Sequence, residues 1–382
     1  MSDGRKPHVI VATTAFLPLV GGAEVAVQEL IGRLSGDFSF TVVTARLSRM
    51  LPAREQWNGV QIIRVGWGTR FDKVWMLIAL TWHAARLRRA GGVDLVWAVM
   101  ASYAGAAAWV ARTILRIPYA LMLQEGDNLV ALERRLAAVL PLYKLIFKHA
   151  AGIQAIAPFL ADWAHHMGGV RAAVVIPNGV ASGDFITSVE EHASLRACTR
   201  QELGIPADAP VVLSVSRLVV KNGLADLIAA VQKLSARTHL IIVGEGELRA
   251  SLEKQATSLG QRVHFVGTKS QKELLAYTCA ADIFSRPSLS EGQGIVFLEA
   301  MSVGLPIVAT HVGGIPSMIE TEITGLLVPP HAPDELAGAL SRLQENPELC
   351  ERLVHAGRTQ ATRFSWTLIA PQISAWLTSC LG

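Results

Sequence analysis

Short apolar runs rich in valine and isoleucine alternate along the chain with longer segments whose apolar residues recur at helical spacing. This alternation is typical of parallel β-sheets that are covered by helices on both faces. Helices in the first half are predicted at residues 23–34, 73–90, 105–115 and 132–149. The strands predicted between them are residues 8–13, 40–44, 60–65, 94–99, 119–123, 152–156 and 173–176.

The same pattern begins again in the second half of the chain. Residues 183–210 contain several charged residues, Gly183 and Pro206 without clear strand character, and we predict an interdomain connection there. The length of 382 residues also favours two domains, which we place at residues 1–182 and 211–364. Strands of the second domain are predicted at residues 211–216, 239–243, 262–266, 282–285 and 306–309, with helices starting near residues 223, 247, 271, 294 and 333.

Composition narrows the class of protein. Hydrophobic residues make up 51% and charged residues 17% of the chain, which excludes a disordered protein. A net charge of +4 spread over this length does not indicate nucleic-acid binding. The four cysteines are scattered, so we expect a reduced, cytoplasmic compartment and neither a disulfide framework nor a zinc site. We interpret the apolar run at residues 9–20 as a strand and a turn rather than a signal peptide, and no run reaches the ~18 residues that a membrane-spanning helix needs.

Two segments that follow predicted strands carry groups suited to a phosphate. Open α/β sheets bind ligands beyond the carboxyl ends of their strands. Gly21 and Gly22 follow the first strand and open a helix, which fits a phosphate contact or an ordinary turn equally well. Arg217 and Lys221 follow the strand at 211–216, and their charges can neutralise a diphosphate without a metal ion, although surface cations are more often merely solvated.

The segment at residues 287–301 carries the strongest single signal. Its glycines, Gly292 and Gly294, make a loop of bare backbone before a helix whose N-terminal amides can face an anion. Glu291 and Glu299 flank that helix start, so that one carboxylate can reach the hydroxyls of a sugar and the other those of a ribose. Glu299 lies in an apolar run, where a carboxylate without a partner is unfavourable. We therefore predict a site for a nucleotide-sugar.

Several motifs in this order resemble those of the family 4 retaining glycosyltransferases of the GT-B fold. They are the Glu291/Glu299 pair with seven residues between, Gly-Gly-Ala-Glu at 21–24, Ser-Arg-Leu-Val at 216–219, Ile-Pro-Asn-Gly-Val at 176–180 and Gly-Gly-Ile-Pro at 313–316. The resemblance covers essentially the whole chain. It implies two Rossmann-like, doubly wound α/β domains that face each other across a cleft, with a last helix at residues 365–382 that crosses back to the first domain.

The resemblance also implies an activity: transfer of a hexose-type sugar, with retained anomeric configuration, from a UDP-sugar or GDP-sugar to a hydroxyl. The acceptor would be a glycan, a lipid-linked molecule or a small molecule, in polysaccharide or glycolipid synthesis. Neither a metal nor another cofactor is expected. The resemblance implies that Glu291 orients the donor sugar and that Glu299 binds the ribose. It also implies that the backbone from residue 263 to Gly267 contacts the base. The groups implied to hold the diphosphate are Arg217, Lys221 and the amides of Gly294, Ile295 and Val296.

The chain departs from the family pattern after the strand at 119–123. Many members have a His-Gly pair there, whereas this chain has Gln124, Glu125, Gly126 and Asp127. Gln124, Glu125 or Asp127 can substitute for the histidine or contact the acceptor, and Asp127 with Asn128 can equally cap the next helix. Gln293 stands where an aromatic residue is usual.

Three alternatives stay open at this point. The helices at residues 75–89 and 140–149 can lie on a membrane at its inner face, or can be core-packed helices with charged outer faces. The chain can be a sugar-nucleotide epimerase or a phosphorylase of the same fold. It can also be a non-catalytic interaction protein that has kept the fold.

Overall fold

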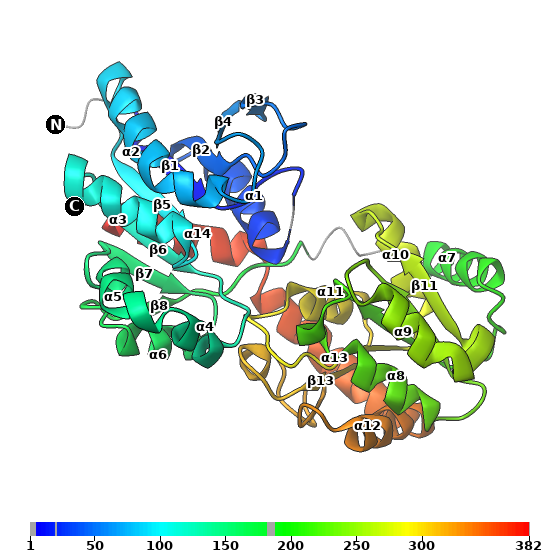
Figure 1. The fold of residues 1–382 in the computed structure, drawn as a ribbon. Coiled ribbons are helices and arrows are strands. Elements are labelled where there is room, and N and C mark those ends of the chain that lie inside the picture. Colours follow the sequence, from blue (N-terminus) through cyan, green and yellow to red (C-terminus); the bar gives the residue numbers. More distant parts are fainter. Residues whose placement is uncertain (1–4, 20, 182–187, 382) are drawn as a thin grey trace. The chain divides into compact units, whose positions relative to one another are not determined.

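The chain folds into two compact units, each built around one sheet (Figure 1). The structure is a computed structural model that describes residues 5–19, 21–181 and 188–381. One unit comprises Met1–Gly179 together with Trp366–Gly382, and the other comprises Val180–Ser365. The C-terminal segment of the chain thus belongs to the same unit as its N-terminal half.

The sheet of the first unit has eight strands in the order β3-β4-β2-β1-β5-β6-β7-β8. All neighbours are parallel except β3 and β4, which are antiparallel. The edge strand β3 was not predicted because its residues, Arg-Glu-Gln-Trp, are mostly exposed and lack an apolar face. The strands are β1 (His8–Thr13), β2 (Ser39–Ala45), β3 (Arg54–Trp57), β4 (Val60–Val65), β5 (Leu95–Val99), β6 (Tyr119–Leu123), β7 (Gly152–Ala155) and β8 (Val174–Val175).

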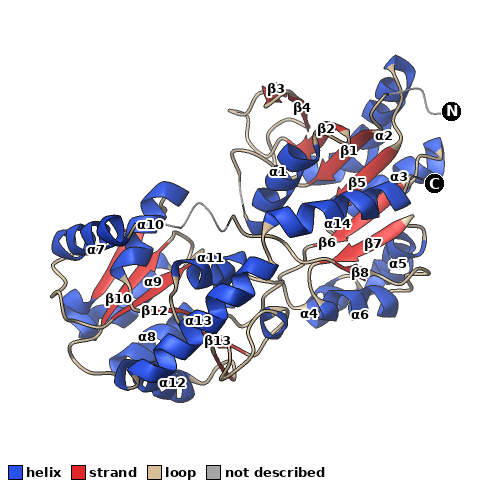
Figure 2. Ribbon diagram, turned by 180° about the vertical axis from the view of Figure 1, so that it is seen from behind, coloured by secondary structure: helices blue, strands red, loops and turns tan. Residues whose placement is uncertain are grey.

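Helices cover both faces of this sheet (Figure 2). Apolar side chains of α2, α3, α5 and α6 form one core with the strands, while α1 and α14 pack against each other on the other face. The helices are α1 (Gly22–Leu34), α2 (Asp72–Ala90), α3 (Tyr103–Leu115), α4 (Leu129–Arg135), η1 (Ala137–Val139), α5 (Leu140–Lys148), α6 (Pro158–His166) and α14 (Trp366–Ser379).

The single helix predicted at residues 132–149 was wrong. The structure has α4, the 3-10 turn η1 and α5 in its place. Pro141 is the cause, because proline has no N–H to donate and its ring clashes with the carbonyl of the preceding turn. It stands in the first turn of α5, where proline is tolerated.

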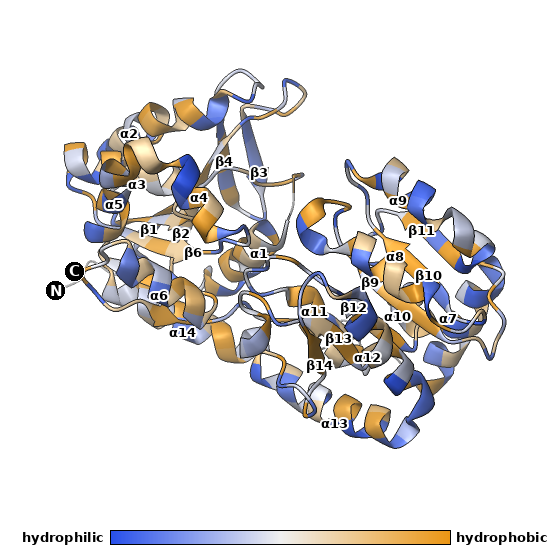
Figure 3. Ribbon diagram, turned by 60° about the horizontal axis from the view of Figure 1, so that its bottom comes forward, coloured by the Kyte–Doolittle hydropathy of each residue, from blue (hydrophilic) through white to orange (hydrophobic). Residues whose placement is uncertain are grey.

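The sheet of the second unit has six parallel strands in the order β11-β10-β9-β12-β13-β14. Its central strands are strongly hydrophobic, as Figure 3 shows for β10, because both faces are covered. The three-residue strand β14 is too short to show a pattern, and it was not predicted. The strands are β9 (Val211–Val215), β10 (His239–Val243), β11 (Val263–Gly267), β12 (Ile283–Arg286), β13 (Ile307–Thr310) and β14 (Leu326–Val328).

Two cores flank this second sheet. One contains side chains of α10 and α11, and the other contains side chains of α8, α9 and α12. The helical segments are α7 (Val189–Glu202), η2 (Val220–Asn222), α8 (Leu224–Gln232), α9 (Arg249–Gln255), η3 (Ala256–Arg262), α10 (Gln271–Ala280), α11 (Ile295–Val303), η4 (Ile315–Ser317), α12 (Pro333–Glu345) and α13 (Pro347–Arg363).

The segment at residues 183–210, predicted as an interdomain connection, contains helix α7 instead. Residues 182–187 lie outside the described part of the chain, but α7 packs on α10 and belongs to the second unit. The helix is polar and is attached through charges, since Arg196 and Arg200 donate hydrogen bonds of 2.6 and 2.8 Å to the two oxygens of Asp282. The missing apolar stripe explains why the sequence pattern gave no sign of it.

Candidate functional site

The strand order places a ligand-binding position at the centre of the second sheet. From β9 the chain first adds β10 and β11 on one side, and then adds β12, β13 and β14 on the other. Ligands of open α/β sheets bind at such a reversal, outside the carboxyl ends of the two strands. The segments that follow β9 and β12 are residues 216–223 and 287–294, which contain four of the predicted donor-side residues: Arg217, Lys221, Glu291 and Gly294.

The loop after β9 holds the two predicted cations. Arg217 is exposed and Lys221 is half-buried. The buried Asn222 shapes this loop, because its Nδ2 donates a 2.7 Å hydrogen bond to the carbonyl oxygen of Arg217. The next residue, Gly223, has φ +67°, and a Cβ atom there would lie 1.8 Å from the carbonyl oxygen of Pro287. Only glycine fits this close approach to the loop after β12.

Backbone hydrogen bonds join the loops after β9 and β12. The N–H of Leu289 donates a 2.7 Å bond to the carbonyl oxygen of Lys221. On the other side, the N–H of Gly314 donates a 3.2 Å bond to the carbonyl oxygen of Glu291. The loop that carries Glu291 is therefore held between the loop that carries the two cations and the loop after β13.

Glu291 itself is paired. One carboxylate oxygen, Oε2, accepts a hydrogen bond from Nη2 of Arg286, and the other accepts one of 3.1 Å from the N–H of Gly292. The Glu291 side chain is 17% exposed, so it reaches the surface of the loop. Its carboxylate has acceptor positions left for the hydroxyls of a ligand.

Helix α11 begins immediately after this loop. Its N-cap residue, Gly294, has φ +90°, and Ile295 and Val296 form the first turn. The first amides of a helix attract an anion, helped by the helix dipole. Glu299 is half-buried further along the helix, and burial raises its pKa to about 7 against the opposing effect of the Arg286 charge.

Gly267 ends the edge strand β11 at the same side of the sheet. It has φ +73°, and its carbonyl oxygen accepts a 2.8 Å hydrogen bond from the N–H of Gly244 in the segment after β10. The second unit thus brings Arg217, Lys221, Glu291 and Gly294 together in contacting loops, with Gly267 at the same edge.

In the first unit the strand order reverses between β1 and β5. Gly21 and Gly22 follow β1, and Gly22 opens α1. The N–H of Gly21 donates a 2.8 Å hydrogen bond to Oε2 of Glu24, so that amide has a carboxylate partner within its own turn. The structure therefore favours an ordinary helix start for Gly21, while Gly22 has no atom within 4 Å of an added Cβ.

The residues that replace the family's His-Gly pair lie in two different environments. Gln124 is buried and exchanges two 2.8 Å hydrogen bonds with the side chain of Asn178. Glu125 is also buried: Oε1 accepts a 2.6 Å bond from the N–H of Ala101, whereas Oε2 has no hydrogen-bond partner. Burial raises the pKa of Glu125 to about 7. Asp127 is exposed.

The helix cap at this position comes from Asn128 rather than Asp127. Oδ1 of Asn128 accepts a 3.0 Å hydrogen bond from the N–H of Ala131, in the first turn of α4. Such a cap satisfies one of the free amides at a helix start. Asp127 is thus not needed to start α4.

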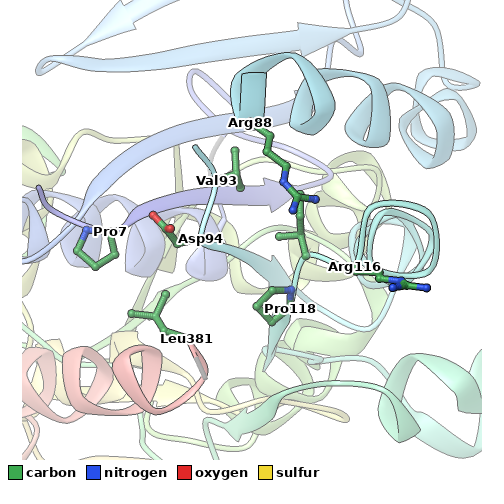
Figure 4. A pocket seen from close by; sticks show the side chains of 8 residues that line it. Pro7, Arg88, Val93, Asp94, Arg116, Pro118 and Leu381 are labelled. Atoms are coloured by element: carbon green, nitrogen blue, oxygen red, sulfur yellow. The ribbon is translucent and has the colours of Figure 1, made fainter. Parts of the chain in front are cut away.

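A pocket in the first unit lies at the opposite edge of its sheet (Figure 4). Pro7, Asp94 and Pro118 line it. These residues immediately precede β1, β5 and β6, respectively. Because it lies at the amino ends of the strands, this pocket includes none of the predicted site residues.

Arg286 is the site residue that sequence reasoning missed. It ends strand β12, pairs with Glu291 and is buried. The available signal was a charged residue at the end of the apolar run of β12, directly before the glycine-rich loop. Asn178, the partner of Gln124, belongs to the Ile-Pro-Asn-Gly-Val motif, but the sequence indicated no role for it.

Within the described parts of the chain, no helix combines the length and the apolar character required to cross a bilayer. Nor do these parts bring three or more histidine, cysteine, aspartate or glutamate side chains together in a group that could hold a metal ion.

Two sequence families match the chain. The family described as "Glycosyl transferases group 1" matches residues 196–360, and the one described as "Glycosyl transferase 4-like domain" matches residues 21–179. Among solved structures, a sucrose-phosphate synthase from Thermosynechococcus elongatus aligns with a TM-score of 0.83 over 98% of both chains, at 24% identity. The HepE protein of Anabaena, solved in complex with UDP and glucose, aligns with a TM-score of 0.80 over 98% of this chain and 100% of its own, at 22% identity.

Curated relatives agree with these matches. A protein of Corynebacterium glutamicum named GDP-mannose-dependent monoacylated alpha-(1-6)-phosphatidylinositol monomannoside mannosyltransferase is 34% identical over 53% of this chain and 55% of its own length. A D-inositol 3-phosphate glycosyltransferase of Corynebacterium efficiens is 34% identical over 56% and 53%. The matches to these two relatives thus span about half of their length. A mannosyltransferase of Mycobacterium tuberculosis, named as GDP-mannose-dependent, is 27% identical over 97% of this chain and 98% of its own length.

The structural neighbours define the class of protein: the fold is that of the GT-B glycosyltransferases, as predicted from the sequence. The chain belongs to glycosyltransferase family 4, and the resemblance drawn from its motifs is confirmed.

Proposed function

We propose that this protein is a retaining glycosyltransferase that moves a hexose-type sugar from a nucleoside-diphosphate sugar to an acceptor hydroxyl. The observation that carries the proposal is that backbone hydrogen bonds join the loop of Arg217 and Lys221 to the loop of Glu291, which precedes α11. Two cations and a helix N-terminus suit a diphosphate, and a carboxylate suits the hydroxyls of a sugar.

The chemistry follows from where charge develops. When the bond between the sugar and the diphosphate breaks, negative charge grows on the leaving oxygen. Arg217, Lys221 and the amides of Gly294, Ile295 and Val296 are the groups that stabilise it, which is the kind of preorganised electrostatics that commonly contributes most to catalysis. No metal ion is required for this step.

The other donor-side residues have binding roles in this proposal. Glu291 orients the donor sugar, and Glu299 accepts hydrogen bonds from the ribose hydroxyls. The backbone at Gly267 contacts the base. The donor is a GDP-sugar or a UDP-sugar: the mannosyltransferase relatives are named as GDP-mannose-dependent, and HepE has been solved with UDP-glucose.

The proposed acceptor is a hydroxyl of a glycolipid. Relatives from Corynebacterium and Mycobacterium are named for phosphatidylinositol mannoside or inositol phosphate substrates. Glycan and small-molecule acceptors are the other two classes that a transfer assay would reveal. We propose residues near Gln124, Glu125 and Asp127 as the acceptor side, with the enzyme at the cytoplasmic face of a membrane.

The outer face of α2 supports membrane contact. One face of α2 packs on the core of the first unit, as one interpretation of the sequence expected, whereas the outer face carries apolar side chains as well as charged ones. Apolar side chains between 40% and 68% exposed lie at helical spacing on α2, namely Val74, Trp75, Ile78 and Trp82, and in the segment just before it, namely Trp67 and Phe71. Exposed cations lie among them, and the guanidinium carbons of Arg70 and Arg86 are 5.4 and 5.0 Å from the ring centroids of Phe71 and Trp82. Exposed aromatic residues beside cations fit an anionic lipid surface.

Vesicle co-sedimentation tests this surface. We expect binding to phosphatidylglycerol vesicles and weaker binding to phosphatidylcholine vesicles. A Trp75→Glu/Ile78→Glu variant should weaken binding to phosphatidylglycerol by about tenfold or more, since it removes two exposed apolar side chains that the lipid would bury. The control is Val170→Glu, which changes an exposed apolar residue outside α2. Equal binding by both variants would contradict the proposal.

The activity is tested in two steps. A thermal-shift screen against UDP, GDP and their sugars identifies the donor, because a ligand stabilises the folded protein by an amount that grows with the logarithm of its concentration relative to its Kd. Transfer is then followed by mass spectrometry with the stabilising donor and glycolipid, glycan and small-molecule acceptors. Isomerisation of the donor without an acceptor would indicate an epimerase, consumption of the donor by free phosphate a phosphorylase, and binding without any turnover a non-catalytic protein.

A further inference from the structure

Arg286 occupies an unusual position for a charged residue. It is the last residue of the central strand β12, and its side chain is 10% exposed. A buried guanidinium destabilises a fold unless its donors are paired. Three contacts accommodate it here: the ion pair with Glu291, a 3.1 Å hydrogen bond from Nε to Oγ of Ser288, and the face of the Phe297 ring 4.9 Å away.

The surrounding backbone makes room for this arrangement. Gly294 has φ +90°, and a Cβ atom on it would lie 3.0 Å from Nη2 of Arg286 and 2.7 Å from Cδ2 of Phe297. Phe297 is itself fixed by an edge-to-face contact with Phe284 of β12. The guanidinium is therefore held by a strand, a loop and the first turn of α11 at once.

Arg286 fixes one of the two oxygens of the Glu291 carboxylate, and the N–H of Gly292 fixes the other. With both oxygens held, the carboxylate keeps one orientation, and its remaining lone pairs can accept hydrogen bonds from the ligand. A lysine would not reproduce this, because one ammonium group on a flexible stem cannot bond Ser288 and Glu291 with the geometry of a planar fork.

We propose that Arg286 is a positioning residue that acts through Glu291, holding its carboxylate in the orientation that binds the donor sugar. The proposal rests on the proposed function. It assigns Arg286 no contact with the diphosphate. Loss of Arg286 should therefore impair the handling of the sugar more than the binding of a nucleoside diphosphate that has no sugar, which loses only the influence of the Arg286 charge on Glu299.

A double-mutant cycle tests this on the full chain, with Arg286→Met, Glu291→Ala and the double variant. We expect Arg286→Met to lower kcat by about 10-fold to 100-fold, and to weaken the Kd for the nucleoside diphosphate by about threefold at most at pH 8, where Glu299 is mostly ionised. The double variant should be no slower than Glu291→Ala alone, since residues that act as a unit are not additive. Arg286→Lys, which keeps the charge but not the planar fork, should have an intermediate kcat, and the melting transition of each variant checks that it is folded.

The matched control is Arg342→Met. Arg342 pairs with Glu322 in the same unit, but both side chains are about half exposed and lie outside the site, so kcat should not change. The proposal would be overturned if the fold-loss of kcat in the double variant equalled the product of the losses in Arg286→Met and Glu291→Ala. Arg286 would then act independently of Glu291. A Kd for the diphosphate that weakens as much as kcat falls would also overturn the proposal. Wild-type protein that binds no nucleoside diphosphate would instead overturn the proposed function, and the positioning role with it.

Discussion

The carboxyl edges of the two sheets differ in where they keep their polar groups. In the second unit, Arg217 and Lys221 lie in one loop, which backbone hydrogen bonds join to the Glu291 loop. In the first unit, Gln124 is paired with Asn178 and Glu125 is buried beneath the surface. The same kind of sheet thus supports an accessible charged site in one unit and a buried polar network in the other. The loops, rather than the fold, carry the difference in chemistry.

The largest effect is expected when one of the cations in the charged site of the second unit is removed. Arg217→Ala or Lys221→Ala should lower kcat by about a hundredfold or more, because each removes a cation from the leaving diphosphate. Steady-state transfer assays with the identified donor measure this. Arg237→Ala is the control, since Arg237 forms an exposed ion pair with Asp208 elsewhere in the same unit. Near-wild-type rates in both site variants would show that the charges do not serve catalysis.

A second prediction concerns the buried network of the first unit. The folded protein keeps a proton on Glu125 up to about pH 7, whereas an unperturbed glutamate loses it near 4.5. Folding therefore takes up a proton in this window, so the stability contributed by the protonated form is full below pH 4.5 and is lost as the pH rises through 7. Relative to Glu125→Gln, the wild type should lose on the order of 2 kcal/mol of unfolding free energy between pH 5 and pH 8.

Urea unfolding at several pH values provides the measurement. The relevant quantity is how the difference in unfolding free energy between wild type and Glu125→Gln changes with pH. Any effect of the glutamine on packing is the same at every pH and therefore cancels. A difference that stays the same from pH 5 to pH 8 would mean that Glu125 is ionised in the folded protein throughout, and the contrast between the two edges would disappear.

The smallest effect sharpens the role of Glu299. With a pKa of about 7, its carboxylate is ionised in about a tenth of molecules at pH 6 and about nine tenths at pH 8. If the ionised form accepts hydrogen bonds from the ribose, affinity for the intact nucleotide-sugar should increase about tenfold over that range. Calorimetric titration of wild type and Glu299→Gln checks this, and the variant should show no such rise. A pH-dependent affinity that persists in Glu299→Gln would assign the titration to another group.

Much of the fold could be predicted because its strands are long apolar runs between helices. Strand β3 was not predicted because an exposed polar edge strand has no hydrophobic pattern. Helix α7 was not predicted because it is attached through the charges of Arg196 and Arg200 rather than through an apolar stripe. Pro141 indicated the break between α4 and α5, but the helical spacing of the apolar residues around it favoured one continuous helix.

The candidate site divides in the same way. The residues of the second unit were found because they are adjacent in sequence or follow neighbouring strands. The pairing of Arg286 with Glu291 was not, since it depends on a turn whose shape is set by Gly294, Thr310 and Gly313. The burial of Gln124 and Glu125 likewise depends on Asn178 and Ala101, which are distant in the chain.

Hydrogen exchange with the stabilising nucleoside diphosphate bound tests the central claim most directly, because it locates the ligand without relying on activity. We predict that the ligand slows amide exchange at residues 216–223 and 288–296 of the second unit and leaves the pocket around Pro7, Asp94 and Pro118 unchanged. Protection confined to that pocket, or absent from both loops after β9 and β12, would contradict the account.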